Sequence, residues 1–336
     1  MVFTVGYPHD QAMAASFAGL VANYPQIAEV YFAVPGRPSG RYELEVDHCA
    51  FVRNLVDIRA AGKKLNMLLN SACDGADALT DSLFERIKRD FHTLARYGCH
   101  PDSVTVTSFR TARFMKEFAP DIKVRISVIN EIRSTTAMAY FGSTADGFYV
   151  DQDLNRNINA LRIMKKWCES NGKELFILAN SACFVDCPFR TEHYNIVAHT
   201  KEIARSLEAE GSSLNERLYD TVPCQAARIG NPLEFALRGT WIPPKNISVY
   251  DGICDMMKLS CRMHPNPKAI FDAYCLGLDC DVLSVLGERL TPIEGSSLIQ
   301  SELPDEMFEK FLTCRARGCD GCGYCSSLAG MLGREK

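Results

Sequence analysis

The chain has 336 residues, of which 47% are hydrophobic and 23% are charged, and its formal net charge is -4. This composition is typical of a soluble globular protein with one barrel-sized domain or two ordinary domains. The slightly acidic balance disfavours nucleic acid as a partner, and the lack of an apolar run of roughly 18 to 20 residues argues against a membrane span.

Eight short runs rich in β-branched or aromatic residues alternate with helix-length segments. The predicted strands are Val2–Gly6, Glu29–Val34, Lys64–Leu69, Ser103–Thr107, Lys123–Ile129, Gly147–Val150, Glu174–Ala179 and Met256–Ser260. Between them apolar residues recur every three or four positions, as in Phe84–Leu94 and Leu154–Trp167, and a glycine follows each of these two stretches. Strands that alternate with helices pair in parallel, so the pattern predicts an α/β fold of the (β/α)8 TIM-barrel type.

Two segments depart from a plain barrel. A long insertion, residues 183–255, separates the seventh and eighth predicted strands and exceeds the usual length of a connection. After Leu290 the chain continues into a cysteine-rich tail. We therefore expect a barrel domain over residues 1–290, insertion included, and a C-terminal extension over residues 291–336.

The sequence contains fifteen cysteines, and its first residues (Met1–Pro8) are typical of a strand rather than of a signal peptide. We therefore expect a cytoplasmic protein in which metal or cluster ligation, rather than disulfide formation, explains the cysteines.

The tail carries four of these cysteines in the pattern C-x4-C-x2-C-x2-C. They are Cys314, Cys319, Cys322 and Cys325, and the glycines among them let the backbone turn so that four sulfurs can converge. The spacing predicts a metal centre, for which a structural zinc site and an iron–sulfur cluster fit equally well. A tail without a bound metal is the third interpretation.

A second set of cysteines lies where the carboxyl ends of the strands are expected. Cys183 and Cys187 follow the seventh strand, Cys224 lies in the insertion, and Cys73 follows the third strand. Chemistry in TIM barrels is placed at this face, so we expect these four to bind a cofactor. Burial as small apolar side chains is the alternative, and other candidates for the fourth ligand are Cys254, Cys261, Cys275 and Cys280.

Polar residues at the same strand ends are candidates for catalysis. Asp151 is as well suited to capping a helix as to catalysis. His193 can donate a proton, bind a metal or make a structural hydrogen bond. Arg156 and Arg190 suit a carboxylate or phosphate, or an ion pair on the rim. The candidate catalytic set is Asn70, Asp151, Arg156, Arg190, His193 and Lys258.

With these residues in view, the chain resembles the collagenase-like peptidase family, number thirty-two among the peptidases of unknown mechanism. The resemblance extends from about Asn66 to Leu278. It rests on Leu-Asn-Ser-Ala-Cys73, Asp151-(x)3-Asn155-Arg156, Asn180-Ser-Ala-Cys183-(x)3-Cys187-Pro-x-Arg190-x-x-His193, Pro223-Cys224 and Lys258-Leu-Ser-x-Arg262. Where the family signature has His-Gly-Ala-x-Cys, this chain has Asn180-Ser-Ala-Cys183.

The resemblance implies iron–sulfur chemistry. Members of the family include proteins for oxygen-independent hydroxylation in ubiquinone synthesis and on RNA bases, several with a [4Fe–4S] cluster on four cysteines and with prephenate implicated as oxygen donor. Other members are named proteases. Carried over by position, Cys183, Cys187 and Cys224, with Cys73, become the expected cluster ligands.

Three functional hypotheses follow. The first is an iron–sulfur barrel enzyme, with one or two [4Fe–4S] clusters, that hydroxylates a small molecule or modified base without oxygen or performs related redox or lyase chemistry. The second is a metal- or thiol-dependent peptidase, in which Cys183 is the nucleophile and His193 the base. The third is a non-enzymatic electron-transfer or zinc-binding accessory subunit. A small-molecule substrate, a redox partner, and a partner subunit or second copy of the chain are the expected partners.

Overall fold

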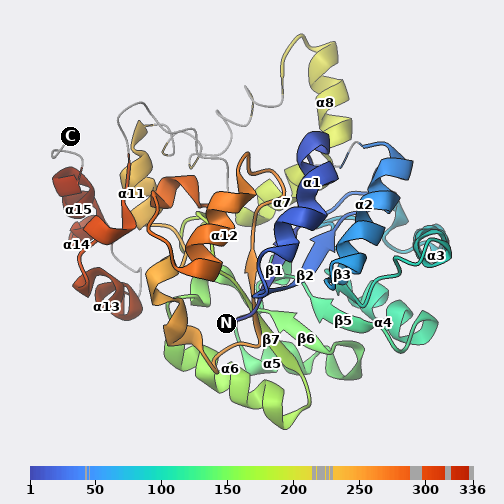
Figure 1. Cartoon of the computed structure of the whole chain (residues 1–336), viewed down its shortest axis with the longest axis horizontal. Helices are drawn as coiled ribbons and strands as arrows, with labels where there is room; N and C mark the ends of the chain where they lie inside the picture. The colour runs from blue at the N-terminus through green and yellow to red at the C-terminus, as the bar shows by residue number, and fades with distance from the viewer. Residues whose placement is uncertain are drawn as a thin grey trace.

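A computed structural model describes residues 1–41, 44, 46–213, 217, 224, 227, 230–287, 297–314 and 319–332. Its strands are β1 (Phe3–Gly6), β2 (Ile27–Phe32), β3 (Lys64–Leu69), β4 (Ser103–Val106), β5 (Lys123–Ile126), β6 (Gly147–Tyr149), β7 (Glu174–Leu178) and β8 (Met256–Leu259). They form a closed barrel in chain order, all neighbouring pairs are parallel, and β8 pairs with β1 (Figure 1). The predicted (β/α)8 barrel is confirmed.

Helices surround the barrel and bury their apolar faces on it. The helices up to the insertion are α1 (Gln11–Ala22), α2 (His48–Ala60), α3 (Asp81–Arg96), α4 (Phe109–Phe118), α5 (Thr135–Ala139) and α6 (Ile158–Ser170). In α3 the buried residues Ile87, Phe91 and Leu94 are those of the predicted stripe. The N-cap carboxylate of Asp10 accepts the backbone N–H of Met13, which fixes the start of α1.

The remaining helices follow β7. They are α7 (Arg190–Ala198), α8 (Thr200–Ala209), α11 (Pro232–Leu237), α12 (Pro267–Leu276), α13 (Glu306–Thr313), α14 (Cys319–Cys322) and α15 (Tyr324–Leu332). No helix in the described ranges combines the length and the apolar character that a membrane crossing requires.

Several strands end earlier than the sequence pattern predicts. The clearest case is β5, which ends at Ile126 rather than at Ile129. The hydroxyl of Ser127 accepts the N–H of Ile129 and starts the 3-10 turn Val128–Asn130, which closes at Glu131 in a left-handed conformation with φ 47°. The early strand end brings Ser127 within hydrogen-bond distance of Asn70, which follows β3.

The barrel interior is polar around one ion pair. Arg125 Nη1 donates to both carboxylate oxygens of Glu29 at 2.8 Å, and the Arg125 guanidinium lies 4.5 Å from the centre of the Phe176 ring. Thr4 and Ser103 donate to the same carboxylate at 2.9 and 3.2 Å. Because strand side chains alternate in direction, residues of several strands meet in this one layer.

A second apolar cluster joins the insertion to the C-terminal segment. Helix α11 packs beside α15, as Figure 1 shows at the side of the barrel away from α3. The buried members of the cluster are Ala182, Leu233, Phe235, Ala236, Leu237, Trp241, Val282, Leu283, Leu286, Leu298, Leu303, Met307, Phe311, Leu328 and Ala329. The expected domain boundary after residue 290 lies outside the described residues.

Breaking the interior ion pair should cost much of the stability of the barrel. We expect Arg125→Met or Glu29→Gln to lower the free energy of unfolding by about 3–5 kcal/mol, because either change leaves a buried charge or hydrogen-bonding group without its partner. Urea denaturation measures this loss, and the exposed pair variant Arg113→Met is the control, with an expected effect within about 0.5 kcal/mol. A loss below 1 kcal/mol for both interior variants would contradict the assigned role of the pair.

Candidate functional site

Lys258 of β8 projects into the carboxyl-terminal mouth of the barrel and is only 8% exposed. Its Nζ lies 4.1 Å from the centre of the Tyr31 ring and 5.2 Å from that of the Tyr149 ring. Arg262, four residues further along, lies 5.8 Å from the Tyr31 ring and is also buried. One ammonium and one guanidinium therefore share an aromatic surface at the mouth.

The connection after β2 folds over these two cations and adds a third. Arg41 Nη2 donates to Ser260 Oγ at 3.4 Å, and Arg262 Nη1 donates to Ser39 Oγ at 3.2 Å. Gly6 at the end of β1 permits this approach, because a Cβ there would overlap the side chains of Arg262 and Tyr31. We call Lys258, Arg262 and Arg41 the mouth cations.

Burial and mutual repulsion shape the charge of this cluster. Burial, reinforced by Arg262 and Arg41, lowers the pKa of Lys258 to about 7. Burial likewise lowers the pKa of Arg262 to about 10, and burial together with both arginines lowers the pKa of His9 to about 3. Among the described residues, no carboxylate lies within ion-pair distance of Lys258 or Arg262. The arrangement suits an anion that supplies the missing charge.

Asn70 lies at the same mouth, as predicted, and connects its loops. Its Oδ1 accepts the N–H of Gly40 at 3.3 Å, and its Nδ2 donates to Ser127 Oγ at 3.3 Å. A Cβ at Gly40 would lie 2.9 Å from the Ile129 side chain and 3.1 Å from Asn70, so this loop is closely packed. Asn70 thus holds the segment Ser39–Arg41 in place.

Asp151 and Arg190 bind each other rather than facing the mouth cations. Arg190 donates to Asp151 at 3.1 Å, to Asp153 at 2.7 Å and to the Phe184 carbonyl at 2.9 Å. Burial opposes the charge of Arg190, but the hydrogen bonds and charges of Asp153 and Asp151 raise its pKa. Arg133 makes a further ion pair with Asp151. This network fixes the loop between Cys183 and Arg190.

Arg156 points toward the C-terminal segment. Its guanidinium carbon lies 3.7 Å from the centre of the Phe311 ring in α13, and its Nη2 donates to the Trp241 carbonyl at 3.4 Å. Burial lowers its pKa to about 10. His193 lies on α7 and is half-buried.

The cysteines expected at the mouth fall into two places. Cys183 and Cys187 are half-buried after β7, and the N–H of Thr240 donates to the carbonyl of Cys183 at 3.0 Å. Cys224 packs on the same apolar cluster as Phe184. Cys73 instead lines a cavity beside β3. Within the described ranges, no three His, Cys, Asp or Glu side chains are close enough to hold a metal ion.

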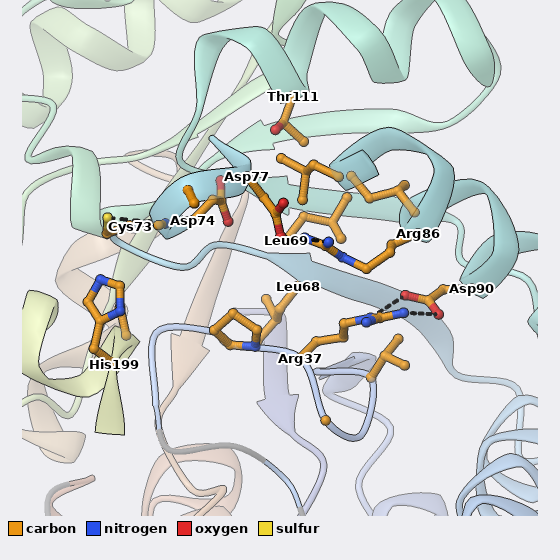
Figure 2. A pocket seen from close by; sticks show the side chains of 18 of the residues that line it. Arg37, Leu68, Leu69, Cys73, Asp74, Asp77, Arg86, Asp90, Thr111 and His199 are labelled. Atoms are coloured by element: carbon orange, nitrogen blue, oxygen red, sulfur yellow. Dashed lines mark hydrogen bonds and ion pairs between the residues drawn. The ribbon is translucent and has the colours of Figure 1, made fainter. Parts of the chain in front are cut away.

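The cavity beside β3 has a volume of about 390 Å³. Figure 2 shows Cys73, Asp74 and His199 at one end of it, and the Arg37–Asp90 ion pair at the other. Gly75 lies between Cys73 and His199. Its N–H donates to Cys73 Sγ at 3.4 Å, and a Cβ at position 75 would lie 3.7 Å from His199 Cε1. Burial raises the pKa of Asp74.

The sequence did not identify Tyr31, Tyr149 and Arg41 as site residues. It also did not identify the residues that lie beside Cys73 in the cavity, such as His199. The two tyrosines are indistinguishable from core aromatics in the sequence, and Arg41 lies in a long connection without a motif. His199 reaches the β3 loop only because the chain after β7 returns across to it. Alternation along β2 and β6, which turns these tyrosines inward, was the one usable signal.

Comparisons with known proteins identify relatives of this chain. No family model matches the sequence. The chain is 24% identical over 269 residues to a protein named uncharacterized protease MJ1657 from Methanocaldococcus jannaschii, covering 79% of this chain and 76% of that one. Among solved structures, the U32 peptidase Mk0906 superposes with a TM-score of 0.53 and 14% identity, over 77% of this chain and 92% of that chain. This structural likeness shows a shared fold.

Anion binding at the mouth should depend on pH through Lys258. Its lowered pKa means that it is charged below about pH 7 and neutral above, so affinity for a dianion should fall as the pH rises, by up to about tenfold per unit. Calorimetric titration with sulfate and malonate, whose own charges stay constant above neutral pH, measures this. Lys258→Met should bind more weakly and without the pH dependence, while Arg113→Met should behave as wild type. Equal affinity in wild type and Lys258→Met would refute the site.

Proposed function

We propose that the chain is a member of the U32 peptidase family and an enzyme acting on an anionic small molecule or modified base bound at the barrel mouth. The proposed chemistry is oxygen-independent hydroxylation or a related redox or lyase step with an iron–sulfur cluster. A redox partner that supplies or accepts electrons belongs to this proposal.

The observation that carries the proposal is the set of mouth cations. Three positive side chains approach one another at the carboxyl ends of the strands. Within the described residues neither Lys258 nor Arg262 forms an ion pair with a carboxylate, and the favourable charge of Glu29 on Lys258 is outweighed by burial and the two arginines. Burying such charges is unfavourable unless a ligand compensates them, and residues with strongly shifted pKa values gather at functional sites. The aromatic rings of Tyr31 and Tyr149 add a flat apolar surface for an unsaturated or ring-shaped substrate.

The chain's own residues have distinct parts in this proposal. Arg262 and Arg41 bind the anionic group of the substrate and orient it through a planar donor array. Lys258, with a pKa of about 7, holds or releases a proton at Nζ near neutral pH. The segment Ser39–Arg41, held by Asn70, excludes water from the bound group.

Cys183, Cys187 and Cys224 suit a cluster in the chemistry of their donor atoms. All three are half-buried, and Ala182, Phe184 and Cys224 belong to or pack against one apolar cluster. Because no three ligand-type side chains of the described residues are close enough to share a metal ion, cluster binding has to draw these loops together. Cys73 lines the separate cavity, so it does not belong to this ligand set. When bound, a cluster supplies one-electron transfer or an iron site that acts as a Lewis acid.

Anaerobically prepared full-length protein should contain iron and acid-labile sulfide. Replacing Cys183 and Cys187 by serine should remove the barrel portion of that iron, because two of the proposed ligands are lost, whereas Cys73→Ser should keep it. Iron and sulfide quantification beside absorption spectroscopy gives the answer. Wild-type protein without iron, or unchanged iron in Cys183→Ser/Cys187→Ser, would end the cluster proposal.

The cavity beside β3 supports hydrolysis of peptide bonds as a second candidate function. Cys73 and His199 line the same end of this cavity, which also has apolar walls that include Leu68 and Leu69. In such a reaction the imidazole of His199 takes the proton of the Cys73 thiol as the sulfur attacks the amide carbonyl. The imidazolium gives this proton to the amine as the C–N bond breaks, and water then hydrolyses the thioester to the carboxylic acid and the free thiol.

Cleavage of a peptide library tests this second candidate directly. If the cavity hydrolyses peptides, cleavage should persist after iron removal and fall by at least about 100-fold in Cys73→Ser and in His199→Ala. The buried Cys99→Ser variant is the matched thiol control. Cleavage that needs iron, or that survives in Cys73→Ser, would exclude this mechanism.

A further inference from the structure

Arg156 is a buried cation between the barrel and the C-terminal segment. One face of its guanidinium lies against the Phe311 ring at 3.7 Å, and Nη2 reaches the Trp241 carbonyl at 3.4 Å. Its Nε is buried and has no hydrogen-bond partner within the described residues. A guanidinium in such surroundings keeps its charge, so the site lacks part of its electrostatic compensation.

No carboxylate in the described part of the chain forms an ion pair with Arg156. The ionisable groups that act on it favourably are Tyr250, Cys325 and Cys314. Tyr250 donates its hydroxyl proton to the Asn155 carbonyl and is therefore a neutral phenol here. The other two groups are the thiols of Cys314 and Cys325, which carry a negative charge when they bind a metal as thiolates.

The chain on either side of the motif is firmly attached beside Arg156. Cys314 ends α13, which carries Phe311, and Cys325 lies in the first turn of α15. Helix α15 is held on α11, because Ser326 donates to Glu234 at 2.7 Å and the Cys325 sulfur lies 3.8 Å from the Leu237 carbonyl. The motif thus starts and ends at positions fixed next to the same cation.

We propose that Cys314, Cys319, Cys322 and Cys325 bind a metal–tetrathiolate centre whose negative charge is compensated by Arg156. Four thiolates around a divalent zinc ion, or around an oxidised [4Fe–4S] core, leave a net charge of about −2, which matches an uncompensated buried cation. The side chain of Cys319 lies outside the described residues, and no three described ligand-type side chains are close enough to share a metal ion. Metal binding therefore requires the other three cysteines to move toward one another.

Metal analysis of the full-length protein, prepared anaerobically, tests the centre itself. We compare wild type with Cys322→Ser/Cys325→Ser and with Cys183→Ser/Cys187→Ser, and measure iron, sulfide and zinc per chain. The tail variant should lose one centre's content, with loss of zinc or of iron plus sulfide identifying its type, whatever happens at the barrel cysteines. Equal metal content in wild type and the tail variant would overturn the proposal and leave the barrel cluster untouched.

Arg156 is tested by charge-removing and charge-keeping replacements. Arg156→Met should release the tail metal to a chelator about 10- to 100-fold faster than wild type, whereas Arg156→Lys should lie near wild type. If the centre contains iron, Arg156→Met should also lower its reduction potential, because reduction adds a negative charge. Equal release rates in wild type and Arg156→Met would contradict the assigned role.

A thermal-stability cycle separates this role from packing on Phe311. Arg156→Met should destabilise the metal-loaded protein but should stabilise the Cys322→Ser/Cys325→Ser variant, in which the cation has no counter-charge. A purely structural Arg156 would give the same loss in both backgrounds, and that result would overturn the proposal.

Discussion

The structure of the barrel mouth depends on a desolvated ammonium held beside two guanidinium groups. The ammonium of Lys258 makes cation–π contacts with Tyr31 and Tyr149, but burial removes most of its hydration. Arg262 and Arg41 also repel its charge. Because its folded pKa lies below that of an unfolded lysine, folding becomes more favourable as the pH rises from about 7 toward the unfolded value. Below that window the charged lysine weakens the fold. A cost of this kind is characteristic of residues kept for binding or catalysis rather than for stability.

The rest of the mouth is organised to hold these cations in place. Gly6 gives Arg262 the room to lie over β1, and Asn70 fixes the loop that brings Ser39 and Arg41 across. On the opposite side, Arg190 with Asp151 and Asp153 fixes the loop that carries Cys183 and Cys187. Two rigid polar networks therefore frame one positively charged centre, which is the arrangement that a preorganised anion site requires.

The sequence predicted the barrel well because its signals are local. Alternating apolar strands and helical stripes such as Ile87, Phe91 and Leu94 are visible without knowledge of the fold. It also identified Lys258 and Asn70 at the mouth, since strand ends define that face. It did not reveal that Asp151 binds Arg190 or that Arg156 turns toward α13, because both depend on where loops far apart in the sequence meet. For the same reason the sequence did not reveal that the long connection after β7 brings His199 to the cavity that Cys73 lines.

The most direct test of the account is the titration of Lys258 itself in the intact protein. Nuclear magnetic resonance of isotope-labelled lysine side chains, assigned with Lys258→Met, follows the Nζ protonation as the pH is varied. The account predicts a midpoint near 7, which moves upward when malonate is added. A midpoint near the ordinary lysine value, unaffected by malonate, would contradict it.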